Sequence, residues 1–153
     1  MRWLIFLAVL VAAGFLLTKK LNPVGTNLPP MAVEYLPGAD PYTLGQPAVI
    51  EFWATWCPPC RESIAHLNEL LHQCSDINLQ IIGLTEEDEE TVTKFRKSTV
   101  MEYSVALDKD NVLSRHFAVR GIPYAVLVDP LGKVRWAGHP AELNKFAINE
   151  ALR

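Results

Sequence analysis

The feature that most constrains the fold is an apolar run that leads directly into two closely spaced cysteines. Residues 51–60 read EFWATWCPPC, and the chain holds only three cysteines among its 153 residues. β-Branched and aromatic residues over 48–54 predict a buried strand. The spacing of apolar residues that follows predicts a helix over 58–74. Cys57 therefore falls where a strand ends and a helix begins.

This position has chemical consequences for Cys57. Backbone N–H groups in the first turn of a helix have no intrahelical partner, and the helix dipole favours an anion there. We therefore expect the pKa of the Cys57 thiol to fall below the free value of about 8.5. Cys60 lies one turn further along, so it can attack a mixed disulfide that Cys57 has formed with a substrate. Pro58 and Pro59 suit the first helical positions, where a missing N–H costs little.

Two other interpretations compete with redox chemistry for this cysteine pair. A structural disulfide across two residues closes too small a loop to stabilise the chain much. A zinc site needs four ligands, usually from a second pair at similar spacing. The chain has no second CxxC or HxxxH motif, and its remaining candidates are Cys74, His66, His72, His116 and His139. Cys-x-x-Cys beside a βαβ pattern favours a redox pair. We therefore predict a redox-active Cys57–Cys60 disulfide, no metal and no organic cofactor.

The rest of the chain predicts an alternation of strands and helices. We expect strands over 31–35, 48–54, 77–84, 103–108, 124–129 and 133–138, and helices over 58–74, 86–99, 110–119 and 140–153. Strands that alternate with helices imply parallel pairs, whereas the last two strands have hairpin spacing and add an antiparallel edge. The predicted fold class is therefore α/β, with a central mixed β-sheet flanked by helices. Cys74 is expected to be a small buried hydrophobe.

The N-terminus carries a separate signal. Residues 3–17 are fifteen residues without a charge, with Arg2 before them and Lys19 and Lys20 after them. This run is short for a membrane span of about 20 residues and long for the apolar part of a signal peptide. No small-residue cleavage site follows it. We interpret 1–20 as an uncleaved, membrane-spanning signal anchor helix, with a cleaved signal peptide as the alternative. The flanking charges leave its orientation undecided.

A proline-rich segment separates this run from the predicted domain. Residues 21–47 hold six of the eleven prolines. We therefore expect a tether over 21–30 and one domain over 31–153. Beyond residue 20 the chain has 11 Lys and Arg against 17 Asp and Glu, a net charge of −6. This balance, without a basic stripe, argues against a nucleic-acid partner.

Two motifs carry a family resemblance. VIEFWATWCPPC, followed far downstream by GIPYAVLVDPLGKV, resembles the thioredoxin superfamily and, more narrowly, the membrane-anchored TlpA/ResA-type thiol-disulfide oxidoreductases, over about residues 28–153. The resemblance implies a thioredoxin-like fold and disulfide exchange with cysteine-containing protein substrates in the reducing direction, for example at haem-attachment cysteines (cytochrome c biogenesis). It implies a membrane thiol reductant as the electron source. It also implies a single-pass anchor in the bacterial cytoplasmic membrane, with the domain in the periplasm or at the outer face.

The resemblance also assigns roles to residues. Pro123, after Ile122, matches the family's cis-proline, whose loop lies against the cysteine pair and pairs with an incoming substrate. Glu51 matches the buried aspartate of thioredoxins, although TlpA/ResA-type chains often have asparagine there. Burial raises the pKa of a carboxyl, so we hypothesise that Glu51 is the general acid/base for Cys60. The alternative is a carboxylate that points outward or pairs with a lysine.

Three further residues, Glu87, Trp56 and Pro58, complete the expected site. Glu87 follows the second strand of the βαβ pattern, where some TlpA/ResA-type members carry a functional acid. The competing interpretation is that Thr85-x-x-Asp88 is a capping box and that the nearby acids suit a helix start. Trp56 is expected to form part of an apolar rim for the substrate. The expected substrate-binding residues are Trp56, Pro58, Ile122 and Pro123.

Two functions from other classes stay open. A peroxidase of the peroxiredoxin kind would have Thr-x-x-Cys, whereas this chain has Thr55-Trp56-Cys57. A copper(I) chaperone could use the two thiolates, because soft thiolates suit that ion, although no Met or His cluster lies nearby. Insulin reduction by the metal-free protein would distinguish disulfide exchange from stoichiometric copper retention.

Overall fold

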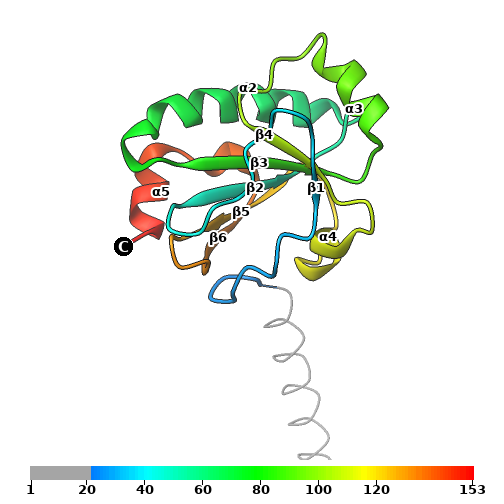
Figure 1. The fold of residues 1–153 in the computed structure, drawn as a ribbon. Coiled ribbons are helices and arrows are strands. Elements are labelled where there is room, and N and C mark those ends of the chain that lie inside the picture. Colours follow the sequence, from blue (N-terminus) through cyan, green and yellow to red (C-terminus); the bar gives the residue numbers. More distant parts are fainter. Residues whose placement is uncertain (1–21) are drawn as a thin grey trace, which may run out of the picture.

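A single mixed β-sheet forms the centre of the computed structural model, which describes residues 22–153 (Figure 1). The predicted anchor over 1–20 therefore lies outside the described residues. In chain order the elements are β1 (Glu34–Tyr35), β2 (Ala48–Phe52), α2 (Pro58–Gln73), η1 (Ser75–Ile77), β3 (Gln80–Thr85), α3 (Glu89–Arg96), β4 (Ser104–Leu107), α4 (Val112–His116), β5 (Tyr124–Val128), β6 (Val134–Gly138), η2 (Pro140–Glu142) and α5 (Lys145–Ala151). Among the residues described, no helix has the length and apolar character needed to cross a membrane.

The strand order is β1-β4-β3-β2-β5-β6. β2, β3 and β4 run parallel to one another, because α2 and α3 carry the chain back between them. β5 is antiparallel to β2, β6 to β5, and β1 to β4. The predicted mixed sheet is thus confirmed, and it places β2, the strand before the cysteine pair, at the centre between β3 and β5.

Helices cover both faces of the sheet (Figure 1). On one face the buried side chains of α2, such as Ile64 and Leu67, pack with residues of α3, α5 and the sheet. On the other face Leu113 of α4 and the adjacent Phe117 pack with Ile50 and other residues of the sheet. All five residues of β2 are buried, since both of its faces and both of its edges are covered. A polar side chain in this strand therefore has no access to water.

The C-terminal helix differs from its prediction. The sequence predicts one helix over 140–153, whereas the structure has the short η2 followed by α5. Leu143 adopts an extended backbone between them and is buried in the core. The Asn144 side chain then caps α5 by accepting the N–H of Ala147 at 2.9 Å. The apolar spacing did not reveal this break, because the buried Leu143 satisfies the pattern in either conformation.

The start of α3 also differs. The competing interpretation of Thr85-x-x-Asp88 as a capping box is wrong, because Thr85 is the last residue of β3 and pairs with Leu107 of β4. Asp88 is the N-cap instead, and its carboxylate accepts the N–H of Thr91 at 2.8 Å. Two residues, Glu86 and Glu87, therefore lie in the connection between β3 and α3 and not in the helix.

Part of the segment interpreted as a tether is attached to the domain. Asn27 forms an antiparallel bridge with Lys133, next to the start of β6. Leu28 donates its N–H to the carbonyl of Gly132 at 2.7 Å. These contacts hold the chain after Asn22 against the β5–β6 hairpin.

Candidate active site

The two cysteines of the CPPC motif form a disulfide at the start of α2. Cys57 is the N-cap residue, with an extended backbone, and its carbonyl accepts the N–H of Cys60 at 3.1 Å. The two Cα atoms are 5.3 Å apart. The structure thus places Cys57 at the junction of strand and helix, as the sequence predicts. Cys60 is completely enclosed and Cys57 nearly so, which leaves Cys57 as the cysteine that can meet a substrate.

The two prolines shape the environment of Cys57. Pro58 and Pro59 occupy the first two positions of α2, so the first N–H of the helix belongs to Cys60 and is already bonded to the Cys57 carbonyl. The Cys57 side chain accepts no capping hydrogen bond. In this oxidised form no N–H of the first turn therefore bonds to the Cys57 sulfur, and we expect the helix dipole to stabilise a Cys57 thiolate in the reduced form.

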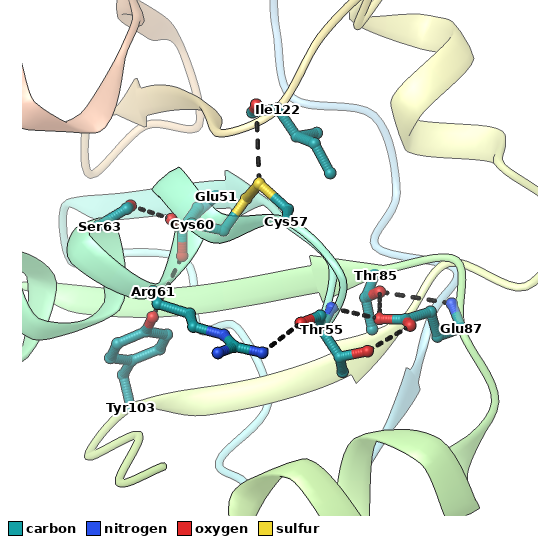
Figure 2. The surroundings of a disulfide bond; sticks show 10 residues. All are labelled: Glu51, Thr55, Cys57, Cys60, Arg61, Ser63, Thr85, Glu87, Tyr103 and Ile122. Atoms are coloured by element: carbon teal, nitrogen blue, oxygen red, sulfur yellow. Dashed lines mark hydrogen bonds between the residues drawn. A yellow bond between two sulfur atoms is a disulfide. The ribbon is translucent and has the colours of Figure 1, made fainter.

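The loop before β5 lies against this disulfide. The Ile122–Pro123 peptide bond is cis, which confirms the prediction. The carbonyl oxygen of Ile122 is 3.8 Å from the Cys57 sulfur, as Figure 2 shows. The two segments meet because β2 and β5 are antiparallel neighbours, so that the end of β2 at Phe52 faces the start of β5 at Tyr124.

A cavity of about 240 Å³ opens between the segment that leads to Cys57 and the loop before β5, and neither cysteine lines it. Its walls include Trp56, Glu86, Glu87, Arg120, Gly121 and Ile122. Trp56 is 71% exposed, although it directly precedes the buried Cys57. Of the predicted substrate-binding residues, the structure brings Trp56 and Ile122 to this cavity. Pro58 lies exposed and Pro123 buried, and neither lines it.

Glu51 lies inside the protein, on the face of β2 that packs against α2. The residue is fully buried. Its carboxylate accepts a hydrogen bond from the Ser63 hydroxyl and another from the Tyr103 hydroxyl at 3.1 Å (Figure 2). Burial raises the pKa of the Glu51 carboxyl to about 7, while these two hydrogen bonds oppose the shift. The alternative of an outward-pointing or lysine-paired carboxylate is therefore wrong.

These contacts relate Glu51 to the cysteine pair. Ser63 is buried three residues after Cys60, on the same face of α2, so the Glu51 carboxyl is held one helical turn from Cys60. A carboxyl with a pKa near 7 exists in both protonation states at neutral pH, which a proton carrier requires. Tyr103 remains a hydrogen-bond donor, because burial and the nearby Glu51 raise the pKa of its hydroxyl well above the usual value.

Glu87 holds the loop that precedes the cysteines. One carboxylate oxygen accepts the N–H of Thr55 and the other accepts the Thr55 hydroxyl, each at 2.7 Å (Figure 2). The Thr85 hydroxyl donates to the same carboxylate at 3.3 Å. Arg61 donates from its guanidinium to the Thr55 carbonyl at 3.5 Å. This arrangement fixes the backbone two residues before Cys57, and it gives Glu87 a positioning role beside the predicted role as an acid.

Sequence reasoning did not find Ser63, Tyr103 or Thr55. Ser63 could have been found, because it follows Cys60 at a spacing that places both on one helix face. Tyr103 carried no signal, since it lies 52 residues from Glu51 in the sequence. Thr55 carried no signal of this role either, because the Glu87 carboxylate that it contacts lies 32 residues away in the sequence.

Cys74 lies apart from the disulfide and is buried and free, as expected. Within residues 22–153, no three His, Cys, Asp or Glu side chains are grouped so that they could hold a metal ion.

The fold and the cysteine site together define a thioredoxin-like thiol-disulfide oxidoreductase. Residues 39–137 match the AhpC/TSA family, and the chain belongs to that family. It is 30% identical over 138 residues to the thiol:disulfide interchange protein DsbE of Escherichia coli, an alignment that covers 85% of this chain and 72% of the relative. It is also 30% identical over 125 residues to the thiol-disulfide oxidoreductase ResA of Bacillus cereus, covering 79% of this chain and 72% of that one.

A solved structure agrees with these relatives. The crystal structure described as a DsbE-type thiol:disulfide interchange protein from Chlorobium tepidum superimposes with a TM-score of 0.71 at 26% sequence identity. The superposition covers 85% of this chain and 98% of that chain. The chain is therefore a thiol-disulfide oxidoreductase of the DsbE/ResA type.

Proposed function

We propose that the chain reduces disulfides in extracytoplasmic protein substrates through Cys57 and Cys60. The observation that supports this most directly is the Cys57–Cys60 disulfide at the start of α2, with the Ile122 carbonyl 3.8 Å from the Cys57 sulfur. A substrate strand that pairs with the backbone of this loop would bring its own disulfide to Cys57. The cavity lined by Trp56 and Ile122 offers apolar contact for the residues around that disulfide.

The first step uses the reduced form of the pair. The Cys57 thiolate attacks one sulfur of the substrate disulfide, so that a Cys57–substrate disulfide forms and the other substrate sulfur leaves as a thiolate. The helix dipole at the start of α2 stabilises the Cys57 thiolate before attack. The exposed Trp56 and the loop at Ile122 border the place where the substrate lies.

The second step uses Cys60 and Glu51. The Cys60 thiol gives its proton to the ionised Glu51 carboxylate, and the Cys60 thiolate attacks the Cys57 sulfur. The Cys57–Cys60 disulfide forms while the second substrate sulfur leaves as a thiolate, so that the substrate has gained two electrons. The substrate thiolate released in the first step takes its proton from water. Glu51 then returns the proton, which balances the charge of the departing thiolate. Its pKa of about 7 allows both transfers near neutral pH.

The cycle needs a reductant, and its class follows from the chemistry. A dithiol must attack the Cys57–Cys60 disulfide and become a disulfide itself, which restores the reduced pair. We propose a membrane thiol reductant in this role. We further propose that residues 1–20 anchor the chain in the bacterial cytoplasmic membrane, with the domain in the periplasm or at the outer face. The uncharged run over 3–17 supports this location.

Insulin reduction tests the exchange reaction. The full chain, purified in detergent and treated to remove metal, is expected to precipitate insulin in the presence of dithiothreitol, and the Cys57→Ser variant is not. Retention of copper(I) in a one-to-one ratio without insulin reduction would support a chaperone and refute exchange. Consumption of hydrogen peroxide that depends on Cys57, again without insulin reduction, would support a peroxidase instead.

A further inference from the structure

Three turns meet at the end of the domain where the described chain begins. They comprise residues 23–28, 42–47 and 129–133, and we call them together the turn surface. Backbone hydrogen bonds connect the three turns and run from Gly25 to Val134, from Leu28 to Gly132 and from Gly45 to Pro130, at 2.8, 2.7 and 2.9 Å. Figure 1 shows the blue chain after Asn22 beside the orange end of the β5–β6 hairpin.

The turn surface exposes apolar side chains. Leu131 is 86% exposed, Leu44 64% and Val24 46%, so this one end carries three of the seven large apolar side chains exposed in residues 22–153. Leu44 lies over the β5–β6 turn, because its Cδ1 atom is 3.3 Å from the position that a Cβ on Gly132 would occupy. A shared patch of this kind marks an interaction site more often than scattered single residues do.

The same surface carries almost no charge, although the chain beyond residue 20 has a net charge of −6. It contains no glutamate, and its one acid, Asp129, is nearly buried. The Asp129 carboxylate accepts the N–H groups of Leu131 and Lys133, each at 2.9 Å. The charged side chain that the surface does expose is Lys133. An anionic or neutral lipid surface is therefore not repelled there.

The predicted anchor that precedes the turn surface indicates that a membrane is the partner that covers this surface. The predicted anchor over 1–20 reaches the surface through Leu21 and Asn22 alone. Two or three extended residues span about 10 Å at most, so an anchored chain keeps the turn surface within that distance of the bilayer. Such a short connection gives a high effective concentration, and even a weak apolar contact is then occupied most of the time.

We propose that the turn surface rests on the membrane from which the chain emerges, with Leu44 and Leu131 among the lipid headgroups. The inference depends on the anchored location proposed above and extends it to an orientation. β2 begins just after the turn of residues 42–47 and ends five residues before Cys57. Its five residues span about 17 Å. The cysteine pair therefore faces away from the bilayer, toward clients and toward extramembrane parts of a reductant.

Depth-dependent fluorescence quenching tests this orientation. The full chain is reconstituted in vesicles of phosphatidylcholine and phosphatidylglycerol, and flotation on a sucrose gradient reports anchoring. A fluorescent unnatural amino acid replaces Leu131 in one sample and Val100, which is 69% exposed in the loop between α3 and β4, in another. Lipids spin-labelled near the headgroup are expected to quench the probe at 131 several-fold more than the probe at 100.

Paired substitutions provide the matched control. With the probe at Gln46, Leu44→Glu combined with Leu131→Glu is expected to lower the quenching several-fold, whereas Val100→Glu leaves it unchanged. Equal quenching at 131 and 100 in floating vesicles overturns the proposed orientation and leaves disulfide exchange intact. A chain that does not float overturns both the anchor and the orientation. If the wild-type chain shows the expected quenching but does not reduce insulin, the exchange reaction is refuted and the orientation stands.

Discussion

Replacing Glu51 with glutamine should change how the stability of the protein depends on pH. Burial raises the pKa of this carboxyl from 4.5 to about 7. An acid whose pKa is higher in the folded state favours folding while it is protonated. Its contribution is fully present below pH 4.5 and is lost as the pH rises toward 7. Since each pKa unit corresponds to about 1.4 kcal/mol, wild-type protein should lose about 3 kcal/mol of unfolding free energy across that window because of Glu51.

Glutamine cannot ionise, so the unfolding free energy of the Glu51→Gln variant does not fall in this way as the pH rises. Urea unfolding of the full chain in detergent, followed by tryptophan fluorescence at pH 5 and pH 8, measures the difference for both proteins. Because part of this stability is already lost at pH 5, the unfolding free energy of the variant should rise by roughly 2 to 3 kcal/mol relative to the wild type between the two pH values. Glutamine can still accept from one hydroxyl and donate to the other, so its fit in the site is retained. If the stability difference between the two proteins is the same at both pH values, Glu51 does not titrate in the folded state as described.

Three further outcomes test the site. Tyr103→Phe removes one donor to the Glu51 carboxylate, so the pH midpoint of substrate release should rise by about one unit or more in stopped-flow kinetics; an unchanged midpoint would refute the contact. Glu87→Ala removes an acceptor of several hydrogen bonds and should lower the unfolding free energy by about 2 kcal/mol and slow insulin reduction, whereas wild-type behaviour in both assays would deny its positioning role. Cys60→Ser should accumulate a mixed disulfide through Cys57 on non-reducing gels, and an absence of trapped substrate would contradict the order of attack.

Much of the fold was predictable because local patterns and global topology agree. Alternating strands and helices determined the parallel core of β2, β3 and β4, and hairpin spacing determined the antiparallel pair of β5 and β6. The position of Cys57 at the start of a helix followed from the same patterns. The Ile122–Pro123 cis bond required the family resemblance, since an X–Pro bond alone indicates only a turn.

The features of the structure that the sequence did not predict depend on competition between nearby residues or on contacts between distant ones. Thr85 and Asp88 are both good capping residues, and pairing of β3 with β4 decided which of them begins α3. Leu143 satisfies a helical pattern but enters the core from an extended backbone. Tyr103 meets Glu51 only after β2 and the chain before β4 have come together, and no local spacing encodes that contact.

The rate at which Cys57 is alkylated tests the central claim most directly. Reduced protein, with Cys57 and Cys60 as free thiols, is treated with iodoacetamide at neutral pH beside a small free thiol, and mass spectrometry assigns the modified residue. Because Cys57 lies at the start of α2, its thiolate should be stabilised, and it should react faster than the free thiol and before Cys60. Reaction of Cys57 at or below the rate of the free thiol, or faster reaction at Cys60, would contradict the account.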